Sequence, residues 1–351
     1  MPDPFNLQCP IPLDDHATVQ MAHGGGGRVM RTLIQDLFLP AFAASNSGAG
    51  PPHDSAVLPP VVGRLAMTTD TFVVSPLFFP GGDIGRLAVF GTVNDLAMAG
   101  AKPLYLSAGF ILEEGLPLET LRRVVDSMAD AAREARVRIV TGDTKVVDRG
   151  KGDGIFINTA GLGVVPAGID VSPLRVAPGD AILVSGDLGR HGIAIMSVRE
   201  GLAFDGAPGS DCACLAGLVE QLTDLGPDLH CLRDLTRGGL AAALNEIADD
   251  ARVGIRLDEA AIPVLEPVAA ACELLGLDPL YVANEGRLVA FVAPQSAQRA
   301  LEILQSCPAA QGPALIGATT ATHPGTVEVR SRLGGGRIVD LLSGEQMPRI
   351  C

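Results

Sequence analysis

Residues 104–147 read LYLSAGFILEEGLPLETLRRVVDSMADAAREARVRIVTGDTKVV, and this stretch decides the fold class. Its first part, residues 104–112, is apolar and predicts a strand. Between residues 118 and 135 the apolar positions recur at helical spacing, which predicts an amphipathic helix. Residues 137–147 predict a second strand, interrupted by Gly-Asp-Thr-Lys. A strand, a helix and a strand in succession are typical of an α/β unit.

The same mixture of strands and helices continues on both sides. Residues 65–74 and 154–165 predict strands and residues 84–99 a helix, whereas the Pro- and Gly-rich residues 166–179 predict a linker. The pattern restarts with a strand at 181–185. We therefore expect an α/β (α+β) chain with two domains of similar size, residues 1–168 and 169–333, and a flexible tail, residues 334–351.

Smaller elements are predicted from local signals. Residues 55–58 are strand-like, and residues 212–225 have helical spacing. A helix with apolar residues from 29 to 38 follows a run of four glycines, and Pro40 is expected to end it.

The composition excludes several classes of function. The 351 residues carry a net charge of −14 without a compensating basic run, which argues against binding to nucleic acid or to an anionic membrane. The N-terminus does not resemble a signal peptide, and no apolar run approaches the length of a membrane span. The seven cysteines have no framework spacing, so we expect a reducing cytoplasm.

Four aspartates stand at the ends of predicted strands or in turns: Asp54, Asp70, Asp95 and Asp143. Taken singly, each is more simply a turn former or a helix cap. Together they favour a metal–nucleotide site, because Mg²⁺ uses one or two carboxylates plus substrate phosphates. The chain has no Walker A motif, so any ATP site belongs to another type.

Three further motifs suit an anion or a proton transfer, and each has a structural alternative. The glycine run at residues 24–27 can wrap phosphate oxygens or act as a hinge. Asp143-Thr144-Lys145 can bind phosphate or form a surface ion pair. The segment 233–239, Arg-Asp-Leu-Thr-Arg-Gly-Gly, can bind an anion or cap a helix. Glu285, in Asn284-Glu285-Gly286, would ordinarily be a solvated turn residue.

The chain ends on a thiol, in Pro348-Arg349-Ile350-Cys351. The last fifteen residues, 337–351, follow three glycines and, when extended, reach about 50 Å. Such a tail can carry a sulfur atom into an active site of the same chain or of a partner. Free movement is the simpler expectation from the glycines, and a switch between two docked positions is equally compatible.

These motifs together resemble the HypE family of hydrogenase maturation factors. The matching segments are His23–Arg28, His53–Val57, Thr69–Phe72, Val93–Ala97, Thr141–Lys145, Arg233–Gly239, Asn284–Gly286 and the terminal Pro-Arg-Ile-Cys. The family lies in the superfamily of aminoimidazole ribonucleotide synthetase, selenophosphate synthetase and thiamine-phosphate kinase, whose other members lack the cysteine tail. The resemblance implies an N-terminal α/β domain that forms a homodimer through its sheet and a C-terminal α/β domain packed against it.

The resemblance also implies an activity. A carbamoyltransferase, HypF, loads a carbamoyl group onto the terminal thiol, and ATP with Mg²⁺ is used to dehydrate it to a thiocyanate. The cyano group then passes to iron on a HypC–HypD scaffold, as a ligand of a nickel–iron hydrogenase centre.

The implied roles fall on residues that match the family motifs. Cys351 is the carrier, Glu285 the candidate base, and Lys145 its relay or electrostatic partner. The implied Mg²⁺ ligands are Asp54, Asp70, Asp95 and Asp234, and the implied nucleotide contacts are Gly25, Gly26, Gly27, Asp70, Asn94, Asp95, Asp143 and Thr144. Two alternatives stay open: a small-molecule ATP-dependent synthetase or kinase, and a metal chaperone that uses the terminal thiol.

Overall fold

The computed structural model describes residues 17–43, 54–201, 208–342, 344, 347 and 349–351. The helical segments are α1 (Arg28–Leu33), the π-helical η2 (Ile34–Phe38), α2 (Leu39–Ala43), α3 (Ile84–Met98), α4 (Leu118–Glu134), α5 (Arg190–Arg199), α6 (Ala216–Leu222), α7 (Gly239–Ala251), α8 (Glu266–Leu275) and α9 (Ala297–Ser306), with short 3₁₀ turns such as η1 (Met21–Gly24) between them. The strands are β1 (Arg64–Phe72), β2 (Phe78–Phe79), β3 (Gly82–Asp83), β4 (Lys102–Glu113), β5 (Arg138–Val147), β6 (Ile155–Val165), β7 (Ala181–Val184), β8 (Leu229–Asp234), β9 (Gly254–Asp258), β10 (Leu288–Val292), β11 (Ala314–Thr320), β12 (Val327–Arg330) and β13 (Gly336–Val339).

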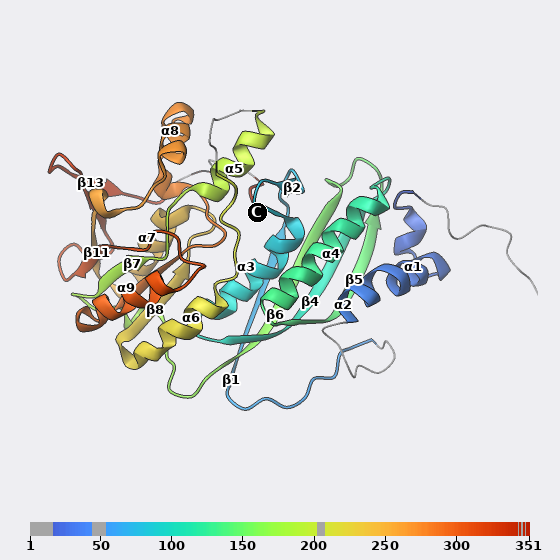
Figure 1. Cartoon of the computed structure of the whole chain (residues 1–351), viewed down its shortest axis with the longest axis horizontal. Coiled ribbons are helices and arrows are strands. Elements are labelled where there is room, and N and C mark those ends of the chain that lie inside the picture. Colours follow the sequence, from blue (N-terminus) through green and yellow to red (C-terminus); the bar gives the residue numbers. More distant parts are fainter. Residues whose placement is uncertain (1–16, 44–53, 202–207, 343, 345–346, 348) are drawn as a thin grey trace, which may run out of the picture.

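The stretch that decides the fold forms β4, α4 and β5, with the two strands parallel. They belong to a four-stranded sheet in the order β1-β6-β4-β5. Helices α3 and α4 cover one face of this sheet (Figure 1). Alternation along the strands sends Phe72, Ile157 and Leu112 into the core on that side. On the opposite face Met67 is 77% exposed, which leaves apolar side chains open to solvent.

The second sheet has seven strands in the order β13-β12-β9-β11-β7-β10-β8. Successive residues of its central strands point to opposite faces, so that Ile182 packs on the α7 side and Leu183 on the side of α6 and α9. The C-terminal end of α3 also reaches this second core through Met98, and α3 contacts β8. Both sheets are flanked by helices, which confirms the predicted α/β (α+β) class.

Three local predictions were wrong. Pro40 lies inside α2 rather than at a helix end, since the chain continues helically from η2 through Ala43. Residues 55–58 form bends and extended backbone outside the sheets. The helix predicted from residue 212 begins at Ala216, and the residues before it form an extended segment that crosses between the two halves of the chain.

The tail differs from the free arm that its glycines suggested. Gly336–Val339, predicted to belong to a flexible segment, form β13 and pair antiparallel with β12. The last residues return to the N-terminal half, where Ile350 is 3% exposed. The end of the chain lies beside β2 and α3 in Figure 1. Apolar packing of Ile350 and Met347 explains why the tail docks. Among the described residues, no helix is long and apolar enough to cross a membrane.

Candidate active site

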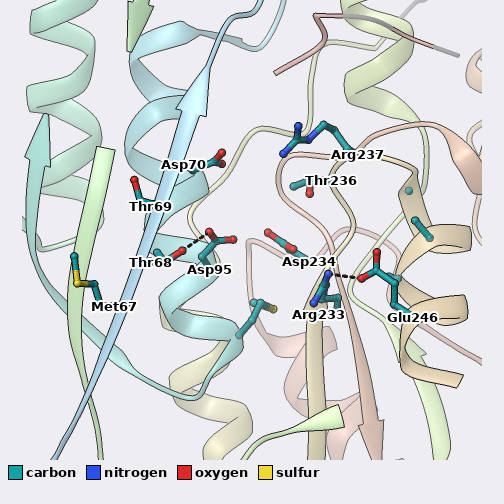
Figure 2. A pocket seen from close by; sticks show the side chains of 14 residues that line it. Met67, Thr68, Thr69, Asp70, Asp95, Arg233, Asp234, Thr236, Arg237 and Glu246 are labelled. Atoms are coloured by element: carbon teal, nitrogen blue, oxygen red, sulfur yellow. Dashed lines mark hydrogen bonds and ion pairs between the residues drawn. The ribbon is translucent and has the colours of Figure 1, made fainter. Parts of the chain in front are cut away.

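Three carboxylates from three elements meet at a cavity of about 490 Å³ between the two halves of the chain. Asp70 comes from β1, Asp95 from α3 and Asp234 from the end of β8, and Figure 2 shows them facing one another. The Thr68 hydroxyl donates a hydrogen bond to Asp95 Oδ2 at 2.9 Å. Thr68 and Asp70 lie two residues apart on one strand and therefore share a face.

Burial, together with nearby like charges, raises the pKa of two of these carboxyl groups. Burial is the largest cause for Asp234, and the charges of Asp95 and Asp70 add to it, so that its pKa is raised to about 7. Burial also raises the pKa of Asp95, although the Thr68 hydrogen bond opposes the shift. A bound cation would relieve this repulsion.

The donors at the cavity are hard oxygen atoms, which suit Mg²⁺. Within the described part of the chain, no group of three or more His, Cys, Asp or Glu side chains is placed to hold a metal ion by itself. That fits Mg²⁺ bound by one or two carboxylates together with phosphate oxygens, and it does not fit a metal cage made by protein alone.

The opposite wall of the cavity is the turn between β8 and α7. Arg237 and Thr236 line the cavity beside Asp234, as Figure 2 shows. Gly239 has a φ of +60°, and a Cβ there would lie 2.6 Å from the carbonyl oxygen of Leu280, so only glycine fits this close approach. Arg233 is paired with Glu246 at 2.5 Å, and its charge also opposes the rise in the pKa of Asp95 and Asp234. Arg237 lines the same cavity.

Arg237 also lines a second cavity of about 480 Å³, whose other wall is the tail. Backbone hydrogen bonds hold the tail there: Val73 N donates to the Cys351 carbonyl at 3.2 Å, and Ser75 N to the Arg349 carbonyl at 3.4 Å. The Arg199 guanidinium donates to the same Arg349 carbonyl at 2.7 Å. The Arg349 side chain itself forms an ion pair with Asp153.

The docked Cys351 thiol lies against Glu285. Burial and then the charge of Glu285 raise the pKa of this thiol well above its ordinary value, and Arg237 opposes the shift. Glu285 is only 4% exposed, and its Oε1 atom has no hydrogen-bond partner among the described residues. Burial, followed by the charges of Asp234 and Asp211, raises the pKa of Glu285 well above its usual range. In both groups the docked arrangement therefore favours the protonated form.

The other predicted site residues lie at the far edge of the four-stranded sheet. Asp143 is in register with Thr71 across β5, β4, β6 and β1, so three strand spacings, about 14 Å, separate them. Lys145 Nζ is 2.5 Å from Asp143 Oδ2, both side chains are exposed, and Thr144 is buried. One chain thus does not bring Lys145 to Glu285 or Asp143 to the carboxylate cavity.

The glycine run lies beside the same edge. A Cβ on Gly24 would lie 2.6 Å from the backbone nitrogen of Val146 in β5, whereas Cβ atoms on Gly26 and Gly27 would meet open space. Gly25 closes the 3₁₀ turn η1. The glycines and Lys145 therefore form a second group of predicted site residues, separate from the carboxylates.

Two predicted residues have other surroundings. Asn94 is 2% exposed, and its amide group donates to the Ala213 carbonyl at 3.0 Å and accepts from Leu215 N at 2.8 Å. Its side chain thus holds a backbone segment, and its role as a nucleotide contact stays a prediction. Asp54 is exposed, lies ahead of β1 and is absent from the lining of the two described cavities, so its place among the metal ligands also stays a prediction.

Sequence reasoning missed three residues of this region: Thr68, Ser210 and Asp211. Thr68 could have been found from its two-residue spacing to Asp70 on a strand. Asp211 is 5% exposed and accepts hydrogen bonds from the backbone nitrogens of Glu285 and Gly286, at 3.2 Å each. The paired residues are 74 and 75 positions apart in the sequence, so no local sequence pattern predicts these contacts.

Comparison with known proteins agrees with this architecture. The family described as AIR synthase related protein matches with its N-terminal domain at residues 52–165 and its C-terminal domain at residues 177–330. A protein of Cupriavidus necator named carbamoyl dehydratase HypE is 57% identical over 334 residues, which cover 95% of both chains. The protein of that name from Escherichia coli is 49% identical over 338 residues, covering 95% of this chain and 99% of the relative.

Solved structures show the same likeness. A crystal structure of the hydrogenase maturation protein HypE in complex with ATP superimposes with a TM-score of 0.90 at 49% identity, covering 95% of this chain and all of that one. The HypE chain of a HypE–HypF complex gives a TM-score of 0.78 at 46% identity, with 90% and 100% covered. A thiamine-monophosphate kinase from Stenotrophomonas maltophilia, 21% identical, shares the fold with a TM-score of 0.63.

Proposed function

The chain belongs to the HypE family of carbamoyl dehydratases, and from this premise we propose that it dehydrates an S-carbamoyl group carried on its own Cys351. The observation that carries the proposal is the position of the Cys351 thiol, which lies against Glu285. The charge of Asp70, at the carboxylate cavity, also raises the pKa of this thiol. ATP is the phosphoryl donor, in keeping with the ATP bound in a close relative.

ATP is needed because the amide oxygen is a poor leaving group. Transfer of the γ-phosphoryl group to the carbamoyl oxygen forms an O–P bond and releases ADP. Cleavage of the C–O bond then releases inorganic phosphate, while the two protons of the nitrogen are lost and the S–C≡N group forms. Positioning and neutralisation of charge carry such a transfer, and a base must accept the protons.

Glu285 is the proposed proton acceptor. It has a free Oε1 atom and lies against the sulfur that carries the cargo. Its raised pKa means that it must lose a proton before it accepts one from the substrate nitrogen. Arg237, which lines both cavities, is placed to bind a phosphate group between the nucleotide and the tail.

Asp70, Asp95 and Asp234 would hold Mg²⁺ together with the triphosphate. The ion would supply charge neutralisation at the phosphates. The raised pKa of Asp234, to about 7, and the raised pKa of Asp95 support this assignment, because a cation would stabilise the ionised carboxylates.

A homodimer formed through the four-stranded sheet would complete the site. The face of this sheet that α3 and α4 do not cover exposes Leu65 by 59% and Met67 by 77%. Asp143 and Lys145 point to the same uncovered face of β5, because Thr144 between them is buried. A second copy stacked on this face would bring Lys145 and the glycine run of the partner toward the carboxylate cavity of the first chain.

Loading of the thiol requires the tail to leave its docked position. A thiol acts as a nucleophile in its ionised form, and burial beside Glu285 keeps the docked Cys351 thiol protonated. We therefore assign loading by a HypF carbamoyltransferase, and delivery of the cyano group to a HypC–HypD scaffold, to an undocked tail. Loading needs a reduced thiol, which a cytoplasmic location would supply.

Mass spectrometry of the intact protein tests the proposal. After incubation with HypF, carbamoyl phosphate and ATP, the chain should gain one carbamoyl group and then lose one water, both on Cys351. Cys351→Ala should abolish loading and leave ATP binding intact. A carbamoyl adduct on another residue, or collapse of nucleotide binding in Cys351→Ala, would overturn the role given to the tail.

A further inference from the structure

The residues that hold the docked tail and those that hold Glu285 come from one short segment. Residues 208–215 form neither helix nor strand and run between the two halves of the chain. Ser210 N donates to the Pro80 carbonyl at 2.7 Å, and Asn94 holds the far end of the segment through Ala213 and Leu215. Hydrogen bonds to Pro80 and Asn94 thus fix the segment to the N-terminal half of the chain.

On the tail side, His191 connects Ser210 to the tail through two hydrogen bonds. His191 is fully buried, and its Nε2 lies 2.8 Å from the Ile350 carbonyl oxygen. A carbonyl oxygen only accepts, so Nε2 carries the proton. Burial lowers the pKa of His191, so the ring is neutral near pH 7 and Nδ1 accepts from the Ser210 hydroxyl at 2.8 Å. The Ser210 Oγ in turn accepts from Cys212 N at 3.0 Å.

These contacts form a chain of hydrogen bonds with one possible direction. It runs from the backbone of Cys212 through Ser210 and His191 to the carbonyl of Ile350, the residue bonded to Cys351. Phe79 holds the imidazole ring edge-on, with ring centroids 5.5 Å apart. The ring therefore has one tautomer and one orientation, and it fixes the backbone immediately before the thiol.

Asp211 holds the backbone of the segment that carries Glu285, the proposed base. Its two carboxylate oxygens accept from the backbone nitrogens of Glu285 and Gly286, and Ala213 N donates to the Glu285 carbonyl at 3.3 Å. A Cβ on Gly286 would lie 1.9 Å from the Asp211 carbonyl oxygen, so the two segments touch as closely as backbone can. Arg287, 1% exposed, lies 3.9 Å from Asp211 and offsets its buried charge.

We propose that residues 210–213 are a positioning element that sets the Cys351 thiol and the Glu285 carboxyl group against each other, Ser210 acting through His191 and Asp211 through the backbone of residues 285 and 286. Neighbouring residues of one rigid segment thereby fix both reacting partners, although one partner sits on a tail that must move. This inference rests on the proposed function for its chemical meaning, but the geometry it describes can be measured without turnover.

The first test measures access to the thiol in the full-length, nucleotide-free protein. Iodoacetamide labelling of Cys351 is followed by mass spectrometry of the C-terminal peptide. Loss of one buried hydrogen bond favours the undocked tail, so His191→Phe and Ser210→Ala should speed labelling about two- to tenfold. His191→Gln, which keeps an N–H donor toward Ile350, should label close to the wild-type rate.

The matched control is His230→Gln, at a histidine of the same half that is hydrogen-bonded to Asp180 and not to the tail. It should leave labelling unchanged. Equal labelling of wild type, His191→Phe and Ser210→Ala would overturn the proposal that Ser210 and His191 hold the tail. Faster labelling of His191→Phe and His191→Gln to the same extent would also overturn it, because the Nε2 donor would then be irrelevant.

The second test addresses Asp211. Asp211→Asn should slow the single-turnover dehydration of a preloaded chain about tenfold or more, with the KM for ATP and the labelling rate of Cys351 unchanged. A loss of ATP affinity with a normal single-turnover rate would contradict a positioning role. If the wild-type chain itself formed no thiocyanate, the proposed function would fail. The labelling results would still show whether Ser210 and His191 hold the tail in its docked position.

Discussion

At the scale of single residues, the site contains four groups in which the protonated form is favoured more than in a free side chain. Asp234, Asp95, Glu285 and Cys351 all have raised pKa values, and burial is the first cause for each. Such groups destabilise a protein that lacks its cation and nucleotide, and they are typical of sites that bind charge or transfer protons.

Asp234 gives a test of this cost. Its pKa is raised from 3.8 to about 7 in the folded chain, so folding disfavours its ionised form, and the penalty grows as pH rises through this range. Asp234→Asn should therefore stabilise the nucleotide-free protein by roughly 1–3 kcal/mol at pH 8 and not at pH 4. Urea denaturation at the two pH values measures this, with Asp54→Asn as the exposed control. A gain of equal size at both pH values would contradict the assignment.

Glu285 predicts a pH dependence of the reaction. Burial raises the pKa of Glu285, so the ionised fraction that can accept a proton increases as pH rises. The single-turnover rate of dehydration at saturating ATP should increase from pH 6 to pH 9, and Glu285→Gln should be slow at every pH. A rate in the wild type that falls over this range would exclude Glu285 as the proton acceptor.

At the scale of elements, the sequence predicted what periodicity controls. Helix α4 and strands β4, β5 and β6 appear close to their predicted bounds, because each contains a clear pattern of apolar residues. The predicted interruption of β5 was wrong, since the strand runs unbroken from Arg138 to Val147. The tail was predicted to be flexible because its glycines are visible in the sequence, whereas the buried environment that receives Ile350 is made by distant residues. Contacts between distant segments, such as Asp211 with Glu285, leave no local pattern.

The turn that carries Glu285 gives a test at this scale. In Gly286→Ala the new Cβ would collide with the Asp211 carbonyl oxygen, and neither backbone segment can yield without moving Glu285. We expect a loss of stability of about 2–4 kcal/mol and at least a tenfold slower dehydration. Gly217→Ala in α6, where a Cβ meets nothing within 4 Å, is the control and should be neutral or slightly stabilising. Unchanged dehydration in Gly286→Ala would contradict the close fit described here.

The uncovered face of the four-stranded sheet gives another test at this scale. Met67→Glu would place a charge in the proposed contact between two copies and should convert the dimer to a monomer in sedimentation velocity. Leu274→Glu on α8, at a side chain of similar exposure on another surface, is the control. A dimer that persists in Met67→Glu would show that the sheet face is not the interface.

At the scale of the whole molecule, the predicted site residues fall into two groups on opposite edges of one sheet. The sequence identified the carboxylates Asp70, Asp95 and Asp234, which the chain brings together, and also Lys145, which it does not. Strand order decides this separation, and strand order could not be predicted from one sequence. The predicted domain limits at residues 168 and 333 likewise stay predictions.

A shared site between two chains predicts complementation. Lys145→Ala and Asp234→Asn should each be inactive, yet mixed dimers would contain one intact site made from the carboxylates of one chain and the lysine of the other. Refolding the two variants together should restore about a quarter of the wild-type activity, as expected for random pairing at a twofold interface. No recovery on mixing would contradict a site shared between the two chains.

The central claim is that ATP removes the oxygen of a carbamoyl group held on Cys351. The most direct measurement loads Cys351 with a carbamoyl group labelled with oxygen-18, adds ATP for a single turnover, and determines the isotope in the inorganic phosphate. The account predicts that the label appears in phosphate as the thiocyanate forms on Cys351. Unlabelled phosphate accompanied by thiocyanate formation would contradict phosphorylation of the carbamoyl oxygen and, with it, the mechanism proposed for this site.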